Sequence, residues 1–336
     1  MTHAERMPHP IRRPVRVDIV VPMFNESEGC VRFHAELKAA IIGTPYRFRF
    51  IYVDDGSTDN TRDMLLKLSI EDKNVRTLEL SRNFGHQAAL TAGLDAADAD
   101  VIIMMDGDGQ HPPALLPQML QLYEAGFDVV QMQRVDPPGS ISPFKRFTSA
   151  TFYTLLRRLG EIDIGMGVAD FRLISREVLD ALRQLPEYHR FLRGMVPWLG
   201  FRRVVLPFEA LERFGGSTKY SFKKMLRLAG DGLFSFSLFP LRLGIFLGCL
   251  FLLLACSEIL YVAAFFISGR SGELIPGWGS LIVMLTVSSG VMMVLMGFIG
   301  IYVGMIFQEV KARPVYIVRS TSANAGLEVH SSTTID

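Results

Sequence analysis

The sequence has few cysteines and almost no excess of charge, and both shortages exclude classes of protein. Its 336 residues include only Cys30, Cys249 and Cys256, which lack the spacing of a metal site. Two of these cysteines lie inside an apolar run, so we expect no disulfide framework and favour a reducing compartment. The formal net charge is +1, whereas proteins that bind nucleic acids usually carry a strong basic excess. No nucleic-acid partner is therefore expected.

Two common sequence signals are also missing. No G-x-G-x-x-G follows the first apolar β-type run, so the ordinary dinucleotide fingerprint is absent. Gly107-Asp108-Gly109 does not supply it, because Pro112 and Pro113 stand where a helix would have to start. Residues 1–15 contain charge and proline without an apolar core, which argues against a secretory signal. We expect them to be flexible and the catalytic part to stay in the cytoplasm.

Two long apolar runs dominate the second half of the chain. Residues 243–267 contain a single charge, Glu258, and residues 281–307 contain none. A helix needs roughly 20 apolar residues to cross a bilayer, so both runs predict membrane spans rather than buried core helices. Lysines and arginines flank the pair at both outer ends, which places both ends in the cytoplasm by the positive-inside tendency. We predict a transmembrane hairpin over 241–310 and a cytoplasmic tail over 311–336.

Three features of this half have more than one interpretation. Residues 221–240 mix lysine and arginine with phenylalanine and leucine, which favours helices in the membrane interface over an ordinary packing helix. Glu258 is either a functional carboxylate or a residue at a helix contact. Glycines four residues apart, at 244 and 248 and at 300 and 304, would allow close helix packing within the hairpin or in a homo-oligomer, which we expect.

Residues 16–135 alternate apolar β-type runs with helical patterns, which predicts a mostly parallel sheet covered by helices. Such α/β sheets bind ligands at the carboxyl ends of their strands. The expected strands are Arg16 to Pro22, Phe48 to Val53, Val75 to Leu80, Val101 to Met105 and Asp128 to Gln133.

Polar residues follow each of the first four expected strands. They occupy positions 23–26, 54–59, 81–86 and 106–110. Any one group could be a turn or a helix cap. Because four of them would meet at one edge of the sheet, we predict a single binding site there.

Two pairs of acids in this set suggest different tasks. Asp106 and Asp108 follow an apolar strand and alternate with glycines, so both carboxylates can face one hard cation. Mg²⁺ binds in this way through one or two carboxylates, waters and substrate phosphates, and would neutralise charge on a departing nucleotide. Asp54 and Asp55 suit ribose hydroxyls and a base N–H, with a metal or phosphorylation site as the alternative.

Six motifs in order resemble glycosyltransferase family 2. They are VVPMFNE (20–26), DDGSTDNT (54–61), LSRNFGHQAALTAGLDAA (80–97), DGDGQHPP (106–113), DFRL (170–173) and GSTKY (216–220). The chain is similar to bacterial polyprenyl-phosphate glycosyltransferases of the GtrB and dolichol-phosphate-mannose-synthase type from about residue 16 to about residue 318. The resemblance implies a GT-A (Rossmann-like) catalytic domain over 16–220, interfacial helices over 221–240, the two-helix hairpin, and an inverting transfer that uses Mg²⁺ or Mn²⁺.

Site residues are carried over from this resemblance by position. The implied metal site is Asp106, Asp108 and Gln110, and the implied active-site acid is Asp170. Arg134 and Arg146 would face phosphate, and Arg213 and Lys219 would lie in the acceptor loop. The implied nucleotide pocket consists of Pro22, Asn25, Glu26, Asp54, Asp55, Gly56, Arg82, Asn83, His86 and Asp106. Gly109 and Thr218 depart mildly from the usual pattern, which leaves the geometry of their loops open.

Some of these residues also have structural interpretations. Each of the cations could instead be solvated at the surface or contact headgroups. His86 could touch a donor phosphate or sit at a helix N-terminus. For His111 we favour a turn over a metal ligand, and Trp198 should pack or lie at the membrane surface.

The predicted activity is transfer of a hexose, first of all glucose from UDP-glucose, to undecaprenyl phosphate at the bacterial inner membrane. Such a phosphate is already largely ionised at neutral pH, so we expect Asp170 to position groups more than to abstract a proton. A processive polysaccharide synthase is the alternative enzyme, although the sequence lacks its Q-x-x-R-W motif and additional spans. A silent, membrane-tethered nucleotide-binding protein is the other alternative, and the intact acids argue against it.

Overall fold

The computed structural model describes residues 16–135, 167–188, 190–211 and 277–322, together with single residues between 244 and 269. The chain divides into two compact units. One contains Met1–Arg157, Ile162–Phe222 and Pro314–Asp336, and the other contains Arg158–Glu161 and Lys223–Arg313. The predicted residues 1–15 and 221–240 lie outside the described part of the chain, as do Arg146, Arg213 and Lys219.

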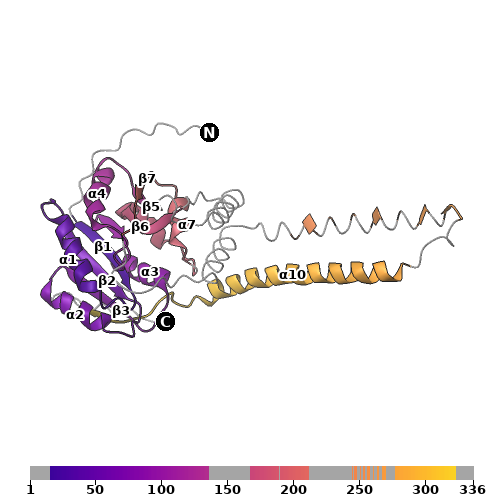
Figure 1. The fold of residues 1–336 in the computed structure, drawn as a ribbon, viewed down its shortest axis with the longest axis horizontal. Coiled ribbons are helices and arrows are strands. Elements are labelled where there is room, and N and C mark those ends of the chain that lie inside the picture. Colours follow the sequence, from indigo (N-terminus) through magenta and orange to yellow (C-terminus); the bar gives the residue numbers. More distant parts are fainter. Residues whose placement is uncertain are drawn as a thin grey trace, which may run out of the picture. The chain divides into compact units, whose positions relative to one another are not determined.

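The first unit is built on an eight-stranded sheet with the order β7-β5-β6-β4-β1-β2-β3-β8 (Figure 1). β1 pairs in parallel with β2 and β4, β2 with β3, and β5 with β7, whereas β6 and β8 run antiparallel to their neighbours. The strands are β1 (Arg16–Met23), β2 (Arg47–Asp54), β3 (Val75–Leu80), β4 (Val101–Met104), β5 (Val129–Arg134), β6 (Val168–Ser175), β7 (Arg203–Phe208) and β8 (Val318–Ser322). The predicted mostly parallel α/β sheet is confirmed.

Apolar side chains on both faces of the central strands bury this sheet between helices. Alternate residues of β1, such as Val17 and Ile19, share one core with Cys30, Phe33 and Leu37. On the other face a helix approaches so closely that a Cβ on Gly93 would lie 2.2 Å from Val20 Cγ1. The helices are α1 (Cys30–Ile41), α2 (Thr61–Glu71), α3 (His86–Ala96), the 3₁₀ turn η1 (Pro113–Leu115), α4 (Leu116–Glu124), α6 (Arg176–Arg183) and α7 (Leu192–Trp198).

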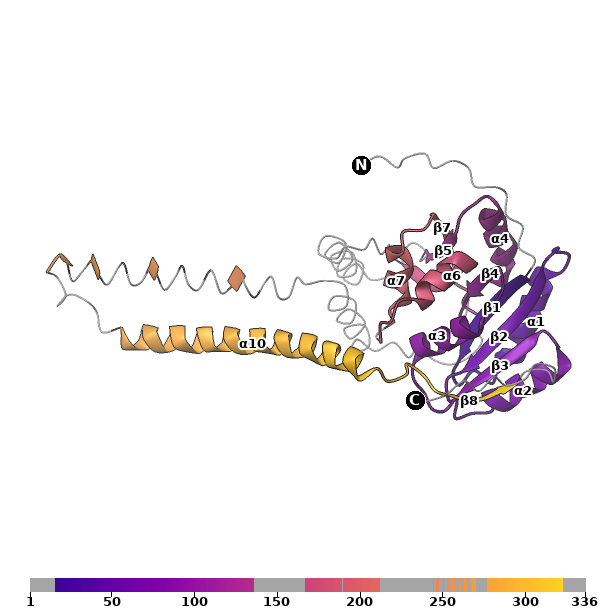
Figure 2. The same ribbon diagram turned by 180° about the vertical axis from the view of Figure 1, so that it is seen from behind.

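The last strand, β8, returns to this sheet after the apolar half of the chain. It pairs antiparallel with β3, and Figure 2 shows the two strands side by side. Ser320 Oγ donates to Glu79 Oε2 at 2.6 Å, and Arg319 lies 3.4 Å from the same carboxylate. Just before the strand, Tyr316 donates to Asp95 at 2.9 Å. The residues predicted as a cytoplasmic tail, 311–336, therefore include an edge strand of the sheet.

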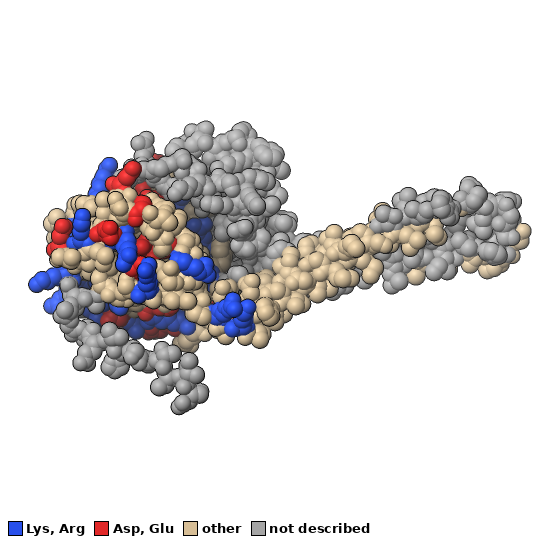
Figure 3. Space-filling model, turned by 90° about the horizontal axis from the view of Figure 1, so that it is seen from below, with Lys and Arg blue, Asp and Glu red and all other residues tan. Residues whose placement is uncertain are grey.

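The second unit contains one long described helix, α10 (Trp278–Lys311). Its stretch Val287–Lys311 has a mean hydropathy of 2.2 and is long and apolar enough to cross a membrane. No part of its most apolar window is buried within the protein, so it is not a core helix. In Figure 3 charged side chains gather over the first unit, whereas the described surface of this helix carries very few. The predicted span over 281–307 lies inside α10.

The other predicted span lies mostly outside the described residues. Those that are described between 244 and 267, among them Gly244, Phe246 and Leu260, are helical. The structure therefore identifies one candidate membrane helix in its described part, and the second member of the hairpin stays a prediction.

Candidate functional site

The loops that follow β1, β2 and β3 are joined by hydrogen bonds at the carboxyl edge of the sheet. Asn25, which adopts a left-handed φ of 54°, receives the Thr58 N–H on its Oδ1 at 2.8 Å and donates its own N–H to Ser57 Oγ at 3.0 Å. Glu26 donates its N–H to Thr61 Oγ1 at 2.9 Å. Asn25 and Glu26 are thus fixed against the loop that carries Asp54 and Asp55, as the sequence pattern predicts.

Asp55 has a task that the sequence does not reveal. Its two carboxylate oxygens accept the backbone N–H groups of Phe84 at 2.8 Å and Gly85 at 3.0 Å. Burial raises the pKa of Asp55 above its usual value, although these two N–H groups oppose the shift. Asp54 is equally buried, receives the Ser57 N–H at 3.1 Å, and also has a pKa raised by burial. Asp55 therefore holds the loop after β3 in place, and its contact with a nucleoside stays a prediction.

Gly56 lies where the loops after β2 and β3 touch. Its φ is +65°, and a Cβ there would lie 2.5 Å from the Arg82 carbonyl carbon and 2.6 Å from the Asn83 nitrogen. A side chain would have to push this backbone away, and Arg82 and Asn83 belong to the predicted nucleotide pocket.

We expect Gly56→Ala to lower the free energy of unfolding by about 2–4 kcal/mol, because it combines left-handed strain with overpacking. Gly43→Ala is the matched control, since Gly43 has a φ of +80° but nothing within 4 Å of its Cβ position. That control should cost about 1 kcal/mol. Urea unfolding measures both changes, and equal losses for the two variants would contradict the close approach.

Two glycines allow the acids after β4 to reach the same edge. A Cβ on Gly107 would lie 2.1 Å from Sδ of the flexible Met23 side chain and 3.1 Å from Val21 Cγ1, so the turn packs closely against β1. Gly109 follows with a φ of +82°. Asp108 is 8% exposed and its Oδ1 accepts the Gln110 N–H at 3.0 Å. The structure thus places Asp106, Asp108 and Gln110 in one short turn.

Two histidines flank Asp106. His111 Nδ1 accepts the Asp106 backbone N–H at 2.9 Å, and its ring stacks on Phe171 with centroids 4.9 Å apart. This contact supports the structural role favoured from the sequence. His86 Nε2 lies 3.4 Å from Asp106 Oδ1 and 3.5 Å from Asp170 Oδ2. His86 therefore links the acids that follow β4 to the acid on β6.

The Asp106–Asp108 turn has donors that fit a divalent cation. Asp106 Oδ1 is buried and accepts no hydrogen bond within the described structure. No group of three or more His, Cys, Asp or Glu side chains suited to a metal occurs among the described residues. Two carboxylates alone match Mg²⁺ or Mn²⁺ bound jointly by protein, water and substrate phosphates, and they do not match a closed structural site.

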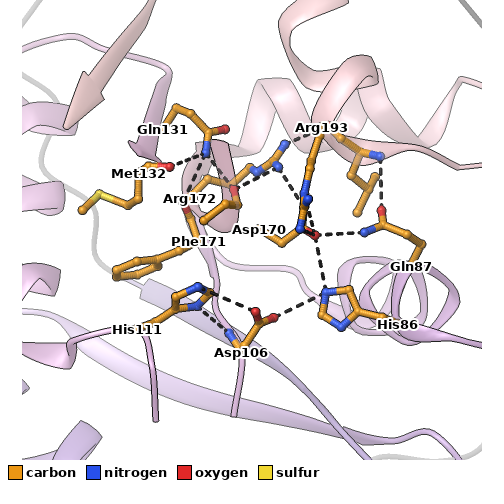
Figure 4. A network of polar contacts seen from close by, with 12 residues as sticks. His86, Gln87, Asp106, His111, Gln131, Met132, Asp170, Phe171, Arg172 and Arg193 are labelled. Atoms are coloured by element: carbon orange, nitrogen blue, oxygen red, sulfur yellow. Dashed lines mark hydrogen bonds and ion pairs between the residues drawn. The ribbon is translucent and has the colours of Figure 1, made fainter. Parts of the chain in front are cut away.

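Asp170 on β6 is the centre of a buried polar network (Figure 4). It is 1% exposed, and its Oδ1 accepts Arg172 Nη2 at 3.0 Å. Its Oδ2 accepts hydrogen bonds from Arg193 Nε at 3.0 Å and Gln87 Nε2 at 3.0 Å, and lies 2.8 Å from Arg193 Nη2 in an ion pair. Gln87 also receives the Leu192 N–H at 3.2 Å. The network thus joins α3, β6 and α7.

This environment fixes the charge of Asp170 and its neighbours. Burial alone would raise the pKa of Asp170, but Arg193, His86 and Arg172 hold it well below its usual range. Burial likewise opposes the charged form of His86, yet Asp106 and Asp170 raise its pKa to about 9. The His86 side chain is 42% exposed, so water screens this pairing and its contribution to stability is small. Burial lowers the pKa of Arg172 to about 10, still charged at neutral pH.

Several site residues lie where the sequence predicts them, and others were not predicted. Pro22 lies in β1, and Arg82 stacks 4.2 Å over the Phe84 ring in the loop after β3. Arg134 ends β5, where its N–H donates to Gly167. Gln87, Arg172 and Arg193 were missed as partners of Asp170. Gln87 directly follows His86, and Arg172 stands two residues after Asp170. Both lie inside motifs quoted above, and this closeness in sequence was the available signal.

Known proteins are similar to the part of this chain that contains Asp106, Asp108 and Asp170. A family model described as "Glycosyl transferase family 2" matches residues 18–183. The uncharacterized glycosyltransferase YkcC of Bacillus subtilis is 37% identical over 92% of this chain and 95% of its own length. The SfII prophage-derived bactoprenol glucosyl transferase of Shigella flexneri is 35% identical over 91% of this chain and 98% of its own. A solved structure of mannosyl-3-phosphoglycerate synthase from Rubrobacter xylanophilus is 16% identical, with a TM-score of 0.49 over 65% of this chain and 71% of its own.

Proposed function

This chain belongs to glycosyl transferase family 2, and we propose that it transfers glucose from UDP-glucose to undecaprenyl phosphate at the cytoplasmic face of a bacterial inner membrane. It is a glycosyltransferase with the GT-A α/β fold. Relatives that match almost its whole length are called bactoprenol glucosyl transferases. The observation that carries the proposal is the pairing of the Asp106–Asp108 turn with the Asp170 network at one edge of the sheet. The transfer inverts the anomeric centre.

The nucleotide-sugar donor would bind at the edge of the sheet formed by the carboxyl ends of β1, β2 and β4. Asp106 and Asp108, with Gln110 beside them, would hold Mg²⁺ or Mn²⁺, which offsets the charge that develops on the departing nucleotide diphosphate. Asn25, Asp54 and the loop at Gly56 form the walls of the proposed nucleotide pocket. Asp55 contributes by keeping the loop after β3 against Gly56.

The acceptor end needs no strong base. The second pKa of a phosphate monoester is near 6, so the attacking oxygen is already ionised at neutral pH. Asp170 is ionised, accepts hydrogen bonds from three side-chain nitrogens and pairs with two arginines, an arrangement that orients cations rather than one that accepts a proton. Arg193, held by Asp170, lowers the repulsion between the phosphates of donor and acceptor. Arg134, Arg146, Arg213 and Lys219 are proposed to assist it.

The acceptor also explains why an enzyme of this kind needs a membrane helix. Each CH₂ group of a lipid that leaves the bilayer costs about 0.8 kcal/mol, so the site must come to the lipid. α10 supplies one apolar segment of sufficient length. We propose that residues 243–267 supply a second, that 221–240 lie in the interface, and that the catalytic domain and both termini face the cytoplasm. Assembly into a homo-oligomer through the glycine faces is part of the same proposal.

The proposal is tested by incubating membranes that contain the protein with undecaprenyl phosphate and Mg²⁺ or Mn²⁺. Parallel reactions receive labelled UDP-glucose, UDP-galactose, UDP-N-acetylglucosamine or GDP-mannose. We expect label from UDP-glucose in the organic phase, with one sugar on each lipid. Label from another donor alone would refute glucose, and label in a long polymer would indicate a processive synthase. No lipid-linked label from any donor would refute the proposed acceptor.

A further inference from the structure

A pocket of about 190 Å³ lies within the first unit, between the β5–β6–β7 part of the sheet and α7. Its walls are mainly apolar, from Val129, Val168, Val196, Pro197, Phe201 and Val205, and Gln131 and Gln133 add two amide groups. None of these residues belongs to the predicted nucleotide or metal site. Val205 on β7, one of its lining residues, is 47% exposed.

Charged side chains give this apolar pocket a particular chemistry. Arg193 and Arg203 line it together with the six apolar residues and the two glutamines. A hydrocarbon ligand alone would not need guanidinium groups, and a free phosphate would not need six apolar walls. The lining therefore fits a ligand in which hydrocarbon is joined directly to an anionic group.

The size of the pocket limits how much hydrocarbon it can hold. An apolar cavity of about 150 Å³ accepts benzene, which has six carbons. A volume of about 190 Å³ therefore accommodates one five-carbon isoprene unit and not a long chain. The remainder of a polyprenyl tail would lie outside this pocket.

Arg193 connects the pocket to the reaction site. Arg193 lines the pocket, and its guanidinium donates from Nε to Asp170 Oδ2 at 3.0 Å and forms an ion pair with the same oxygen at 2.8 Å. His86 lies 3.5 Å from the same Asp170 oxygen and 3.4 Å from Asp106. A phosphate beside Arg193 would thus stand at the end of a chain of charged contacts that leads to the acids of the donor site.

We propose that this pocket holds the isoprene unit next to the phosphate of the polyprenyl phosphate acceptor, with Arg193 and Arg203 beside that phosphate. The inference rests on the proposed function and adds to it a specific lipid subsite. The subsite binds the reacting end of the lipid. It therefore positions the attacking phosphate oxygen and selects isoprenoid phosphates over other anions.

The first test compares Val205→Asp with Ile42→Asp. Both replace an exposed aliphatic side chain by the same carboxylate, but Ile42, which is 81% exposed, follows α1 outside the pocket. In the labelled-lipid assay, Val205→Asp should raise the KM for undecaprenyl phosphate about tenfold or more, because one carbon group in an apolar pocket is worth at least that factor. The KM for UDP-glucose should not change, and Ile42→Asp should behave as the wild type.

The outcomes separate the two proposals. If wild-type protein transfers no label to the lipid, the proposed function fails. If it does transfer label and Val205→Asp has the wild-type KM for the lipid, this pocket is not the subsite.

A second test needs no substituted protein. Wild-type protein in membranes would be irradiated with farnesyl phosphate that carries a diazirine on its phosphate-proximal isoprene unit. Mass spectrometry should find the label in peptides covering 129–133, 167–175 or 192–205, with protection by excess undecaprenyl phosphate. Label confined to other peptides would overturn the proposal even if the enzyme is active.

Discussion

Asp108→Asn should lower kcat for lipid glycosylation by about 100- to 1,000-fold, the loss typical of removing one electrostatic contact to developing charge. Asp108 Oδ1 accepts the Gln110 N–H at 3.0 Å, and an asparagine oxygen can accept the same bond. The substitution therefore keeps this hydrogen bond of the turn and removes the charge and one ligand for the cation. We expect activity to recover partly at high Mg²⁺ or Mn²⁺ concentrations, since metal affinity falls as well.

The measurement is the initial rate of labelled-lipid formation over a series of metal concentrations. Binding of Mn²⁺ to the purified protein, followed by its paramagnetic resonance signal, gives a readout that does not depend on turnover. Asp63→Asn provides the matched control, because Asp63 is an exposed acid on α2. An Asp108→Asn enzyme that keeps wild-type kcat and metal affinity would show that the metal assignment is wrong.

Asp170→Asn should destabilise the first unit by about 3–5 kcal/mol, which is the usual cost of leaving one member of a buried ion pair without its partner. Arg172 is fully buried and donates to Asp170 at 3.0 Å, and Arg193 donates to the other oxygen. An asparagine would turn an NH₂ group toward these donors and leave two guanidinium charges unbalanced. Because Asp170 would no longer hold the Arg193 guanidinium in place, the rate of transfer to the lipid should fall as well.

The pH dependence of stability gives an independent check on this residue. The pKa of Asp170 is held well below its usual range, so its stabilising effect is complete above about pH 4 and is lost as pH falls through the folded-state value. The difference in unfolding free energy between wild type and Asp170→Asn should therefore shrink in acid. It should also decrease somewhat as pH rises from about 6.5 to 9, because Asp170 helps to raise the pKa of His86 to about 9.

The control for this comparison is Asp180→Asn on α6. Asp180 is 48% exposed and pairs with Arg176 at 2.9 Å. The loss there should be about 0.2–1 kcal/mol, because water screens an exposed ion pair. Denaturant unfolding at several pH values measures both variants. Equal losses for the two substitutions would contradict the central role of the Asp170 network.

The sequence predicts the parallel half of the sheet well because its strands are buried on both faces. Ile19–Val21 and Val101–Met104 read as continuous apolar runs, which is typical of such strands. β6 interrupts its run with Asp170 and Arg172, whose burial depends on pairing across elements. β7 and β8 lie at the two edges and have mostly exposed or half-buried residues. β8 reads VRSTS and has no apolar pattern that a sequence could show, whereas the apolar run of β7, RVVLPF, is not matched by burial.

The sequence predicts only those site residues whose position depends on their immediate neighbours along the chain. The acids after β2 and β4 follow apolar strands, so their position at the carboxyl edge could be inferred. The partners of Asp170 could not, because Gln87 and Arg193 stand 83 and 23 residues from it along the chain. The role of Asp55 as a receiver of backbone N–H groups depends on how the loop after β3 folds back, which no motif encodes.

The sheet of this enzyme can be completed only late in synthesis, because β8 is its last strand along the chain. Because Val318–Ser322 follows α10 in the chain, the ribosome must synthesise the apolar half before the strand that covers β3 exists. Until then β3 presents an open edge, which is the kind of surface that pairs with other chains and aggregates. A nascent chain that stalls during bilayer insertion would therefore keep that edge uncovered, and chaperones or proteases could recognise the unfinished enzyme by it.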